Sequence, residues 1–256
     1  MTRSAAWATA WNLVRLAMSV AIVAAITTQL SASIATATDL GRDLATTIVN
    51  FFSFFTILSN AAAAVVLAWA ALWYFARARA AGAAGAAGAD AEPVGLAVAL
   101  ASVTTYMVIT GIVYNALLRG IELPQGSEPV PWSNEVLHLI APLVLTADLF
   151  VGPLRRALPW RAIWVVVAFP IVWVVYTLVR GPLVTNPASG DPFWYPYPFL
   201  NPNNPGGWPS VVVYVLGIAA AIIAIAALVV WWGRRIGRAE RSSPMAAGAS
   251  AASDIP

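Results

Sequence analysis

The residues with the clearest capacity for chemistry in this chain are Thr56 and its single histidine, His138. A hydroxyl beside an imidazole is the minimal pair for acyl transfer, because the imidazole can accept the hydroxyl proton and later pass it to the leaving alkoxide. The chain has no cysteine, which excludes thiolate nucleophiles, disulfides and sulfur-ligated metals. A single histidine also excludes a two-histidine metal or haem site within one chain. We therefore expect no metal and no cofactor.

Further polar side chains are candidates for the same pocket, as donors to a developing oxyanion or as supports for the base. They are Asn60, Tyr114, Asn115, Asn134, Tyr176 and Arg180. Each also has an interpretation without chemistry. A lone histidine near a helix start can be an ordinary hydrogen-bonded interface residue, and a threonine in a membrane helix often bonds to its own backbone. Tyrosine and arginine at the ends of spans serve as anchors or extend to the membrane surface. The hypothesis of a pocket therefore depends on the convergence of these side chains.

The composition places these residues in a membrane protein. Of the 256 residues, 60% are hydrophobic and only 10% are charged, whereas soluble proteins carry about 25% charged residues. Six apolar segments are long enough, or nearly so, to cross about 30 Å of hydrocarbon; they lie at about residues 13–30, 49–75, 94–118, 135–151, 162–179 and 210–232. The predicted fold is an all-α bundle of six transmembrane helices within residues 1–238, followed by a disordered tail over residues 239–256.

The positions of the arginines predict the orientation of this bundle. With the N-terminus inside, ten arginines fall in inner segments and three in outer loops. Because basic residues are enriched in cytoplasmic loops, we expect a multi-pass protein of the cell membrane with both termini cytoplasmic. The same placement accounts for the net positive charge without a nucleic-acid partner. The stretch 31–37 resembles a signal-peptide cleavage region, although Trp7 and Trp11 favour a retained first span.

The predicted spans bring the polar candidates to one level of the outer leaflet. The second span, read from Val49 inward, places Thr56 roughly 10 Å deep, and the fourth, read from Asn134, places His138 roughly 6 Å deep. Polar groups at membrane depth require partners, so they are expected to face a protein interior or a wet cavity. We therefore predict that Thr56 and His138 face each other across these two spans.

The outer loop at residues 180–209 differs from the other connections, because it holds eight prolines and the aromatic run 193–199. Proline reduces the number of conformations open to the unfolded loop, which favours one ordered shape. One interpretation is a lid over the pocket, with Tyr197 and Phe199 among its covering residues. The alternative is an aromatic belt at the membrane surface.

Three short segments resemble a known family, the androgen-induced and androgen-dependent membrane threonine hydrolases, whose bacterial relatives are six-span proteins. The resemblance lies in Phe55-Thr56, in Trp132-x-Asn134-x-x-x-His138 and in Tyr197-Pro198-Phe199-Leu200. An acidic residue ten positions after the histidine, here Asp148, also fits. Family members hydrolyse fatty acid esters of hydroxy fatty acids. The resemblance implies Thr56 as the nucleophile and His138 as the base.

The sequence thus favours a membrane threonine hydrolase that takes a lipid ester from the bilayer. The alternative from another class is a lipid or small-amphiphile binding or transport protein without catalysis. A transporter requires polar groups along a whole path through the membrane, whereas the polar set here lies in one leaflet. Pro142 and Pro170 lie inside spans and could act as hinges, which keeps transport open. A structural membrane subunit is the third possibility, and it requires no reactive residue.

Overall fold

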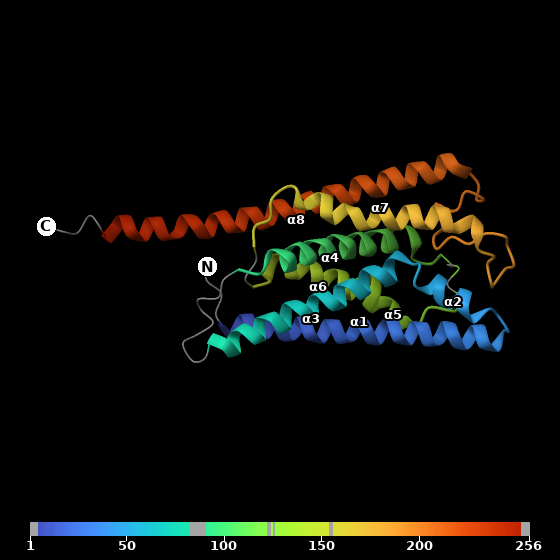
Figure 1. The fold of residues 1–256 in the computed structure, drawn as a ribbon, viewed down its shortest axis with the longest axis horizontal. Helices are drawn as coiled ribbons and strands as arrows, with labels where there is room; N and C mark the ends of the chain where they lie inside the picture. The colour runs from blue at the N-terminus through green and yellow to red at the C-terminus, as the bar shows by residue number, and fades with distance from the viewer. Residues whose placement is uncertain (1–4, 82–90, 122–123, 125, 154–155, 252–256) are drawn as a thin grey trace.

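The computed structural model describes residues 5–81, 91–121, 124, 126–153 and 156–251, with side chains to residue 235. Within these residues the chain is all-helical, and six helices are long and apolar enough to cross a membrane. Their cores are α1 (Ala5–Asp39), α3 (Phe55–Ala81), α4 (Val94–Val113), α6 (Ala141–Val151), α7 (Ala162–Arg180) and α8 (Gly207–Ala251) (Figure 1).

Shorter helical segments adjoin these spans. A π-helical turn, η3 (Tyr114–Leu118), continues α4, and the fourth span begins with α5 (Pro131–Glu135) and a second π-helical turn, η4 (Val136–Ile140). The short helix α2 (Leu44–Phe51) precedes α3, and two 3-10 turns, η5 (Gly181–Leu183) and η6 (Pro198–Leu200), lie between α7 and α8.

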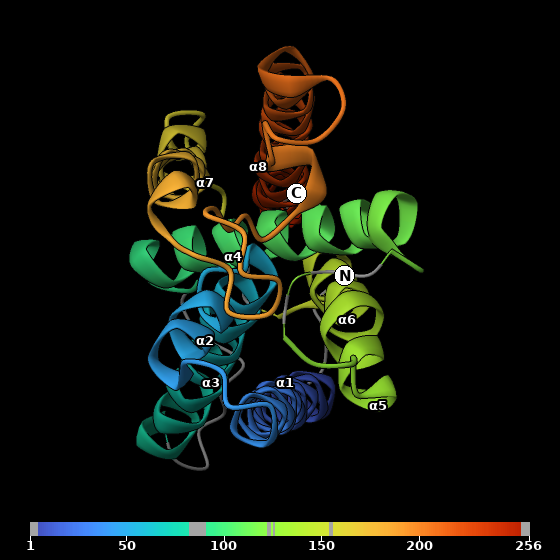
Figure 2. The ribbon, with the colours of Figure 1, turned by 90° about the vertical axis from the view of Figure 1, so that its right-hand side faces the viewer.

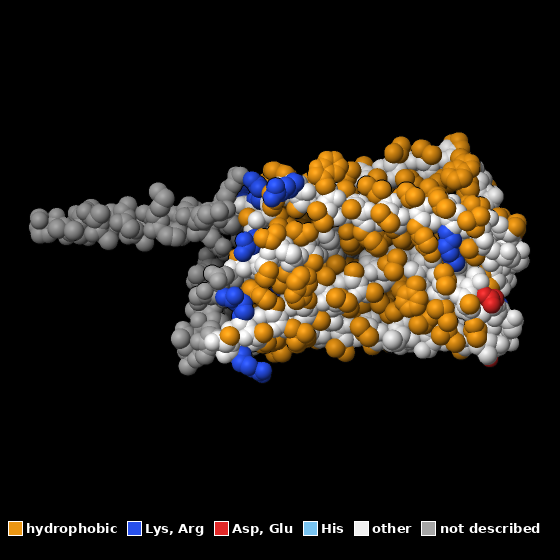
Figure 3. Space-filling view, viewed as in Figure 1, with side chains coloured by type: hydrophobic (Ala, Val, Ile, Leu, Met, Phe, Trp, Pro, Cys, Tyr) orange, Lys and Arg blue, Asp and Glu red, His pale blue; other side chains and the backbone are white. Residues whose placement is uncertain are grey.

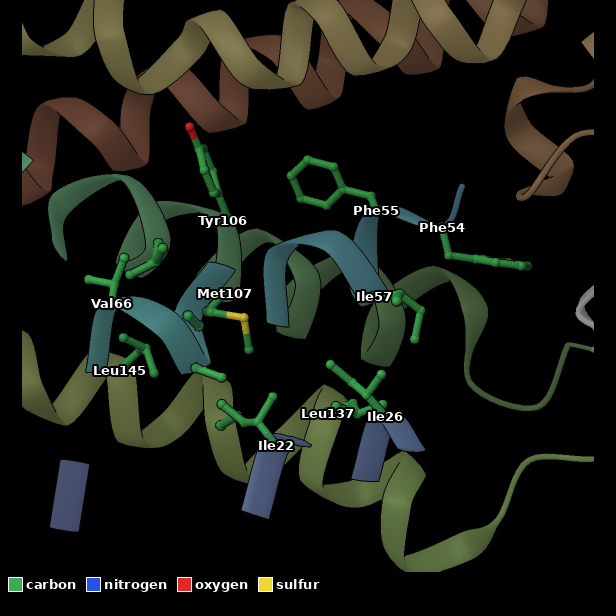
Figure 4. Close-up of a cluster of buried hydrophobic side chains, with 14 of the residues drawn as sticks. Ile22, Ile26, Phe54, Phe55, Ile57, Val66, Tyr106, Met107, Leu137 and Leu145 are labelled. Atoms are coloured by element: carbon green, nitrogen blue, oxygen red, sulfur yellow. The ribbon is translucent and has the colours of Figure 1, made fainter. Parts of the chain in front are cut away.

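Helix α4 lies at the centre of the bundle. Viewed from the end (Figure 2), α7 and α8 lie on one side of α4, and α1, α3 and the α5–α6 span lie on the other. The main core forms between α1, α3, α4 and α6, where Ile22, Met107 and Leu145 are fully buried (Figure 4).

Close packing of α1 against α3 follows from small side chains. Ala63, Ala64 and Ala70 of α3 are buried, and the Ser19 hydroxyl of α1 donates to the carbonyl oxygen of Ala64 at 2.8 Å. Small residues let two helix backbones approach, and a hydroxyl–carbonyl bond between helices adds to the van der Waals attraction in a lipid environment.

The face of the bundle shown in Figure 3 is apolar over most of its length. Exposed side chains include those of Val20, Val65, Trp164 and Leu216. In Figure 3, basic side chains gather at the end where α1 begins and α8 ends, which is called the terminal end below. The opposite end, called the distal end below, carries α2 and the segment 181–206. An apolar surface of this extent is what a lipid environment requires.

The break between α2 and α3 corrects one expectation. The second span was expected to be continuous from Val49, with Thr56 two turns inside it, but α2 ends at Phe51 and α3 begins at Phe55. Thr56 therefore lies in the first turn of its helix. Helix α2 itself has a clear start, because the Asp43 carboxylate accepts a bond from the Thr46 N–H at 2.7 Å and caps it.

The last span also differs in length from the expected segment. The backbone of α8 is helical to Ala251, well past the expected end of the transmembrane domain at residue 238. The disorder predicted for residues 239–256 stays a prediction, because residues 252–256 and the side chains from residue 236 onward lie outside the described part of the chain.

A buried ionic cluster links three segments in the terminal half of the bundle. Arg15 of α1 donates to both carboxylate oxygens of Asp148 in α6, from Nε at 2.8 Å and from a terminal nitrogen at 3.2 Å. Arg15 also pairs at 3.4 Å with Glu92, which lies two residues before α4. Asn12 accepts a further bond from Arg15, and Trp11 donates to Asp148. The buried guanidinium of Arg15 is thus paired with two carboxylates and one amide oxygen, and a buried cation requires such partners.

The orientation of the bundle in the membrane stays a prediction with a direct test. In bacterial cells, a fluorescent protein that matures only in the cytoplasm is expected to be active when it is fused after Arg241, because ten arginines lie in the inner segments of the predicted topology. Alkaline phosphatase, which is active only in the periplasm, should be inactive at that position. The matched control places alkaline phosphatase after Ser189 in the distal segment, where it should be active. The reverse pattern would overturn the predicted orientation.

Candidate functional site

A cavity of about 780 Å³ lies between α1, the start of α3, η3, the α5–η4 segment and Tyr197. Both Thr56 and His138 line it, together with Tyr114, Asn134 and Tyr197. Its remaining wall includes polar groups near the distal end, namely Gln29, Arg42, Ser127 and Glu128. The residues predicted as nucleophile and base thus share one cavity with a partly polar wall. A concave site with a few convergent polar groups is the usual form of a small-molecule site.

Thr56 is positioned by the start of α3 and by Tyr197. Its backbone N–H donates to the Tyr197 hydroxyl at 3.2 Å, and its own hydroxyl lies 3.3 Å from the same phenol oxygen. The first N–H groups of a helix have no partner within the helix, so the phenol oxygen satisfies one of them. The consequence is that Thr56 presents a hydroxyl and a neighbouring backbone N–H at one point of the cavity wall.

Tyr197 is held in place by a cluster of aromatic rings. It is buried, and its ring packs edge-on against Phe54 with ring centres 5.5 Å apart. Burial raises the pKa of the Tyr197 hydroxyl, so the phenol keeps its proton and can donate a hydrogen bond.

The segment that carries Tyr197 returns to the end of α7 through a contact that only glycine permits. The Trp194 N–H donates to the Gly181 carbonyl at 2.9 Å, and a Cβ at Gly181 would collide with the ring of Tyr195. Trp194 and Tyr195 are both buried. The aromatic run therefore lies against the helices, with Tyr197 on the cavity wall; a lid function for Tyr197 and Phe199 stays a prediction.

His138 is oriented by the π-helical turn in which it lies. Its Nδ1 donates to the backbone carbonyl of Asn134 at 3.0 Å, which leaves Nε2 as the basic nitrogen of the neutral ring. The Tyr114 ring stacks on the imidazole with ring centres 3.7 Å apart, and the Asn134 amide donates to the Tyr114 hydroxyl at 2.6 Å. A π-helical turn is a frequent feature of functional sites, and here two of them, η3 and η4, supply the stacked pair.

Asn60 connects the segment of Thr56 with the segment of His138. Its side-chain nitrogen donates to the Thr56 carbonyl at 2.9 Å and to the Leu137 carbonyl at 3.1 Å. The residue is fully buried and does not line the cavity, and its side-chain oxygen has no hydrogen-bond partner among the described residues. Asn60 is therefore placed to hold α3 against η4, rather than to contact a substrate.

Asn115 lies outside the cavity wall. It is exposed, and its amide donates to the carbonyls of Gly111 and His138 at 2.8 and 3.1 Å. Its oxygen accepts from Arg119, which also forms a two-point ion pair with Glu135. These bonds join η3 to the helix of His138 from the outside. Asn115, like Glu135, thus supports the backbone of the base and does not touch the cavity.

Tyr176 and Arg180 are likewise not brought to the cavity. The Tyr176 hydroxyl lies 3.0 Å from the Ser53 hydroxyl, and Arg180 donates to the Asn50 side chain at 2.7 Å. These bonds connect α7 to the end of α2, through Asn50, and to the break before α3, through Ser53. The sequence placed both residues at the level of Thr56 and His138, but their side chains contact Ser53 and Asn50 and do not line the cavity.

The direct partner of each proposed catalytic residue is a different tyrosine. Among the hydrogen bonds of the described residues, none joins Thr56 to His138; the Thr56 hydroxyl contacts Tyr197, and the His138 ring contacts Tyr114. Asp148 lies in the ionic cluster of the terminal half and does not approach His138. The structure thus forms no direct bond between Thr56 and His138, and the prediction that the two side chains face each other is supported only by the cavity that both line.

No group of three or more metal-ligating side chains occurs among the described residues. Comparison of the chain with models of protein families, with curated proteins and with solved structures gives no match. The assignment of function therefore depends on the geometry of the site itself.

The sequence did not indicate the direct contact of Tyr197 with Thr56 or the close packing of Gly181 against Tyr195. A tyrosine within a run of prolines and aromatic residues gives no indication of which ring points inward, so the sequence supported Tyr197 only as part of a lid. The signal that existed was its place in the Tyr-Pro-Phe-Leu segment, which also supplied the resemblance.

Proposed function

We propose that this protein is a membrane hydrolase of lipid esters, with Thr56 as nucleophile and His138 as base. The observation that carries the proposal is the single cavity that Thr56 and His138 both line. Supporting it, the Nδ1 bond to Asn134 fixes the histidine tautomer that has a basic Nε2. A hydroxyl and a basic imidazole nitrogen on one cavity wall are the groups that acyl transfer requires.

The proposed reaction proceeds in two acyl transfers. His138 Nε2 takes the proton of the Thr56 hydroxyl while the Thr56 oxygen attacks the ester carbonyl carbon, and the carbonyl oxygen becomes an oxyanion. The carbon–oxygen bond to the alcohol then breaks, and His138 returns the proton to the leaving alkoxide. Water, deprotonated by His138, releases the acid from Thr56 by the same steps. For the first step, the Thr56 hydroxyl must exchange its contact with Tyr197 for one with His138.

Tyr197 is the proposed donor to the oxyanion. Its hydroxyl lies 3.3 Å from the Thr56 hydroxyl and accepts the Thr56 N–H at 3.2 Å. A carbonyl oxygen bound at Thr56 would replace the phenol oxygen as the acceptor of this N–H and would accept a second bond from the phenol. Two donors preorganised at the site of developing charge are the usual form of an oxyanion hole. The buried, neutral phenol suits this role, because it donates without carrying a charge.

A binding protein for small amphiphiles without catalysis is the second candidate. The observation that favours it is the contact of the Thr56 hydroxyl with Tyr197 and not with His138. In that case the tyrosine, threonine and histidine would serve only to bind a polar head group.

The test that separates the two candidates is covalent labelling of detergent-solubilised protein with a lipophilic fluorophosphonate. The hydrolase proposal expects a phosphonate adduct on the peptide that contains Thr56, and expects its loss in Thr56→Ala. A matched control is Ser59→Ala, which removes a buried hydroxyl that bonds the Thr56 carbonyl and Thr110 away from the cavity. Bound probe without an adduct on Thr56 would support the binding protein instead.

Replacement of Tyr197 by phenylalanine tests the oxyanion donor. We expect kcat to fall about 100-fold with little change in KM, because loss of one oxyanion donor weakens the transition state more than the ground state. The matched control is Tyr195→Phe, which removes the hydroxyl of a neighbouring buried tyrosine that lines no cavity wall at Thr56. Equal effects of the two substitutions would point to packing of the aromatic run and not to oxyanion binding.

A further inference from the structure

A second cavity lies on the other side of Thr56, between α4, α7 and α8. It has a volume of about 180 Å³, and its wall is almost entirely apolar, with Phe55, Ile109, Val174 and Ile218 among the contributing residues. This cavity is called the apolar groove below. Its chemistry is opposite to that of the larger cavity, whose wall includes Gln29, Arg42 and Glu128.

The apolar groove and the larger cavity meet at the proposed nucleophile. Thr56, Tyr114, Leu118 and Tyr197 line both of them. A molecule bound with its reacting carbon at Thr56 therefore has an apolar space on one side and a partly polar space on the other. A fatty acid ester has a long alkyl chain on one side of its carbonyl carbon and an alcohol part on the other. The apolar groove fits the alkyl chain, and the larger cavity fits the alcohol part.

The apolar groove opens toward the lipid-facing surface of the bundle. Trp164 and Ile171 of α7 and Ile223 of α8 line it, and these three side chains are 73%, 56% and 47% exposed. On α8 its wall extends from Val215 to Ile223, roughly 12 Å along the helix axis. The groove thus runs from Thr56 toward the middle of the membrane, the direction in which a lipid chain lies.

We propose that the apolar groove binds the acyl chain of the lipid ester, with the ester carbonyl at Thr56 and the alcohol part in the larger cavity. This inference rests on the hydrolase function proposed above. It assigns the acyl part of the substrate to the apolar groove and the alcohol part to the larger cavity. The opposite placement would put alkyl carbons against Arg42 and Glu128 and leave these polar groups without water. The acyl chain enters between α7 and α8 without crossing the aqueous phase, because the groove is open to lipid.

Blocking the groove is the direct test. Ala219 lines the groove on α8, whereas Ala220, one residue further, is also exposed and does not line it. Ala219→Trp is expected to lower kcat/KM for p-nitrophenyl palmitate at least 10-fold and to leave that for p-nitrophenyl acetate within twofold. Ala220→Trp is expected to change neither value more than twofold. An equal loss for both esters in Ala219→Trp, or a loss as large in Ala220→Trp, would overturn the placement of the acyl chain.

A labelling experiment tests the groove without reference to hydrolysis. A palmitoyl ester with a diazirine near the end of its chain is expected, on illumination in detergent, to label the groove-facing peptides of α7 and α8 in the Thr56→Ala variant. Ala219→Trp in that background should lose the label, and Ala220→Trp should keep it. Even labelling of every lipid-facing helix would refute the groove. Hydrolysis that persists in Thr56→Ala refutes the hydrolase proposal instead, and the position of the label then decides the groove by itself.

Discussion

Ester hydrolysis by the Thr56→Ala variant is expected to fall about 1,000-fold or more, to the level of the background reaction. The substitution removes the attacking oxygen but keeps a small side chain in the first turn of α3, so the fold has no reason to change. Without the nucleophile no acyl-enzyme intermediate forms, so the whole catalysed reaction is lost and not a fraction of it. The measurement is kcat/KM for a chromogenic ester in detergent micelles, beside the melting temperature of the same preparation.

Two further variants make this result specific. Thr56→Ser keeps the hydroxyl and loses a methyl group, so measurable activity should survive. His138→Ala should be as inactive as Thr56→Ala, and the double variant should be no worse than either, because nucleophile and base act as a unit. A folded but inactive Thr56→Ser protein beside an active Thr56→Ala protein would show that Thr56 serves only in packing.

The largest expected effect on stability comes from Asp148→Ala. Asp148 accepts two bonds from Arg15, and both side chains are buried. Removal of one partner leaves a buried cation with incomplete compensation, which destabilises proteins by about 3–5 kcal/mol. The expected result is a clear fall of the melting temperature in detergent, or failure of the variant to accumulate in the membrane.

The exposed ion pair at the distal end supplies the matched control. Glu135 lies in the same span as Asp148 and forms a two-point pair with Arg119, but both side chains are substantially exposed, at 39% and 44%. Glu135→Ala should therefore lower the melting temperature far less than Asp148→Ala, because exposed pairs are screened by water. If the two variants were equally stable, the buried cluster would have no special structural role.

The six spans could be predicted from the sequence because hydropathy is a local property. The last four apolar segments begin or end next to charged residues, glycine or proline, and the spans at residues 94–118 and 162–179 agree with the structure within a few residues. The fourth span begins earlier than expected, at Pro131, since proline is well suited to the first turn of a helix.

The break before Thr56 could not be predicted, because distant residues stabilise it. Residues 51–55 contain no glycine or proline, and four of the five are phenylalanine. The carbonyl of Ser53 at the break accepts a bond from the Trp173 side chain at 3.0 Å, and the Ser53 hydroxyl contacts Tyr176. Both partners come from α7, so the bonds that replace the helical ones are invisible to any local pattern.

The polar candidates show the same limit. Depth along a span follows from counting residues, and the four residues that this count placed at one level, Thr56, His138, Tyr114 and Asn134, line one cavity. The direction in which a side chain points depends on the rotation of each helix about its axis, which the sequence left open for α7. The two π-helical turns also make side-chain directions hard to predict from sequence, because each turn shifts the following residues around the helix axis. Glu92 was missed in the ionic cluster since it lies outside any span.

The length of α1 has a consequence for where the cavity opens. The 35 residues of α1 extend roughly 52 Å, about 20 Å more than the hydrocarbon core of a bilayer. Part of this helix therefore stands among head groups and water. Gln29, Ala32 and Thr36, which line the larger cavity, belong to its distal quarter or lie close to it. If the excess length of α1 stands at the distal end, the cavity opens at the boundary between hydrocarbon and water. The two products of the proposed hydrolysis would then separate there, the alcohol toward the aqueous side and the fatty acid into the bilayer.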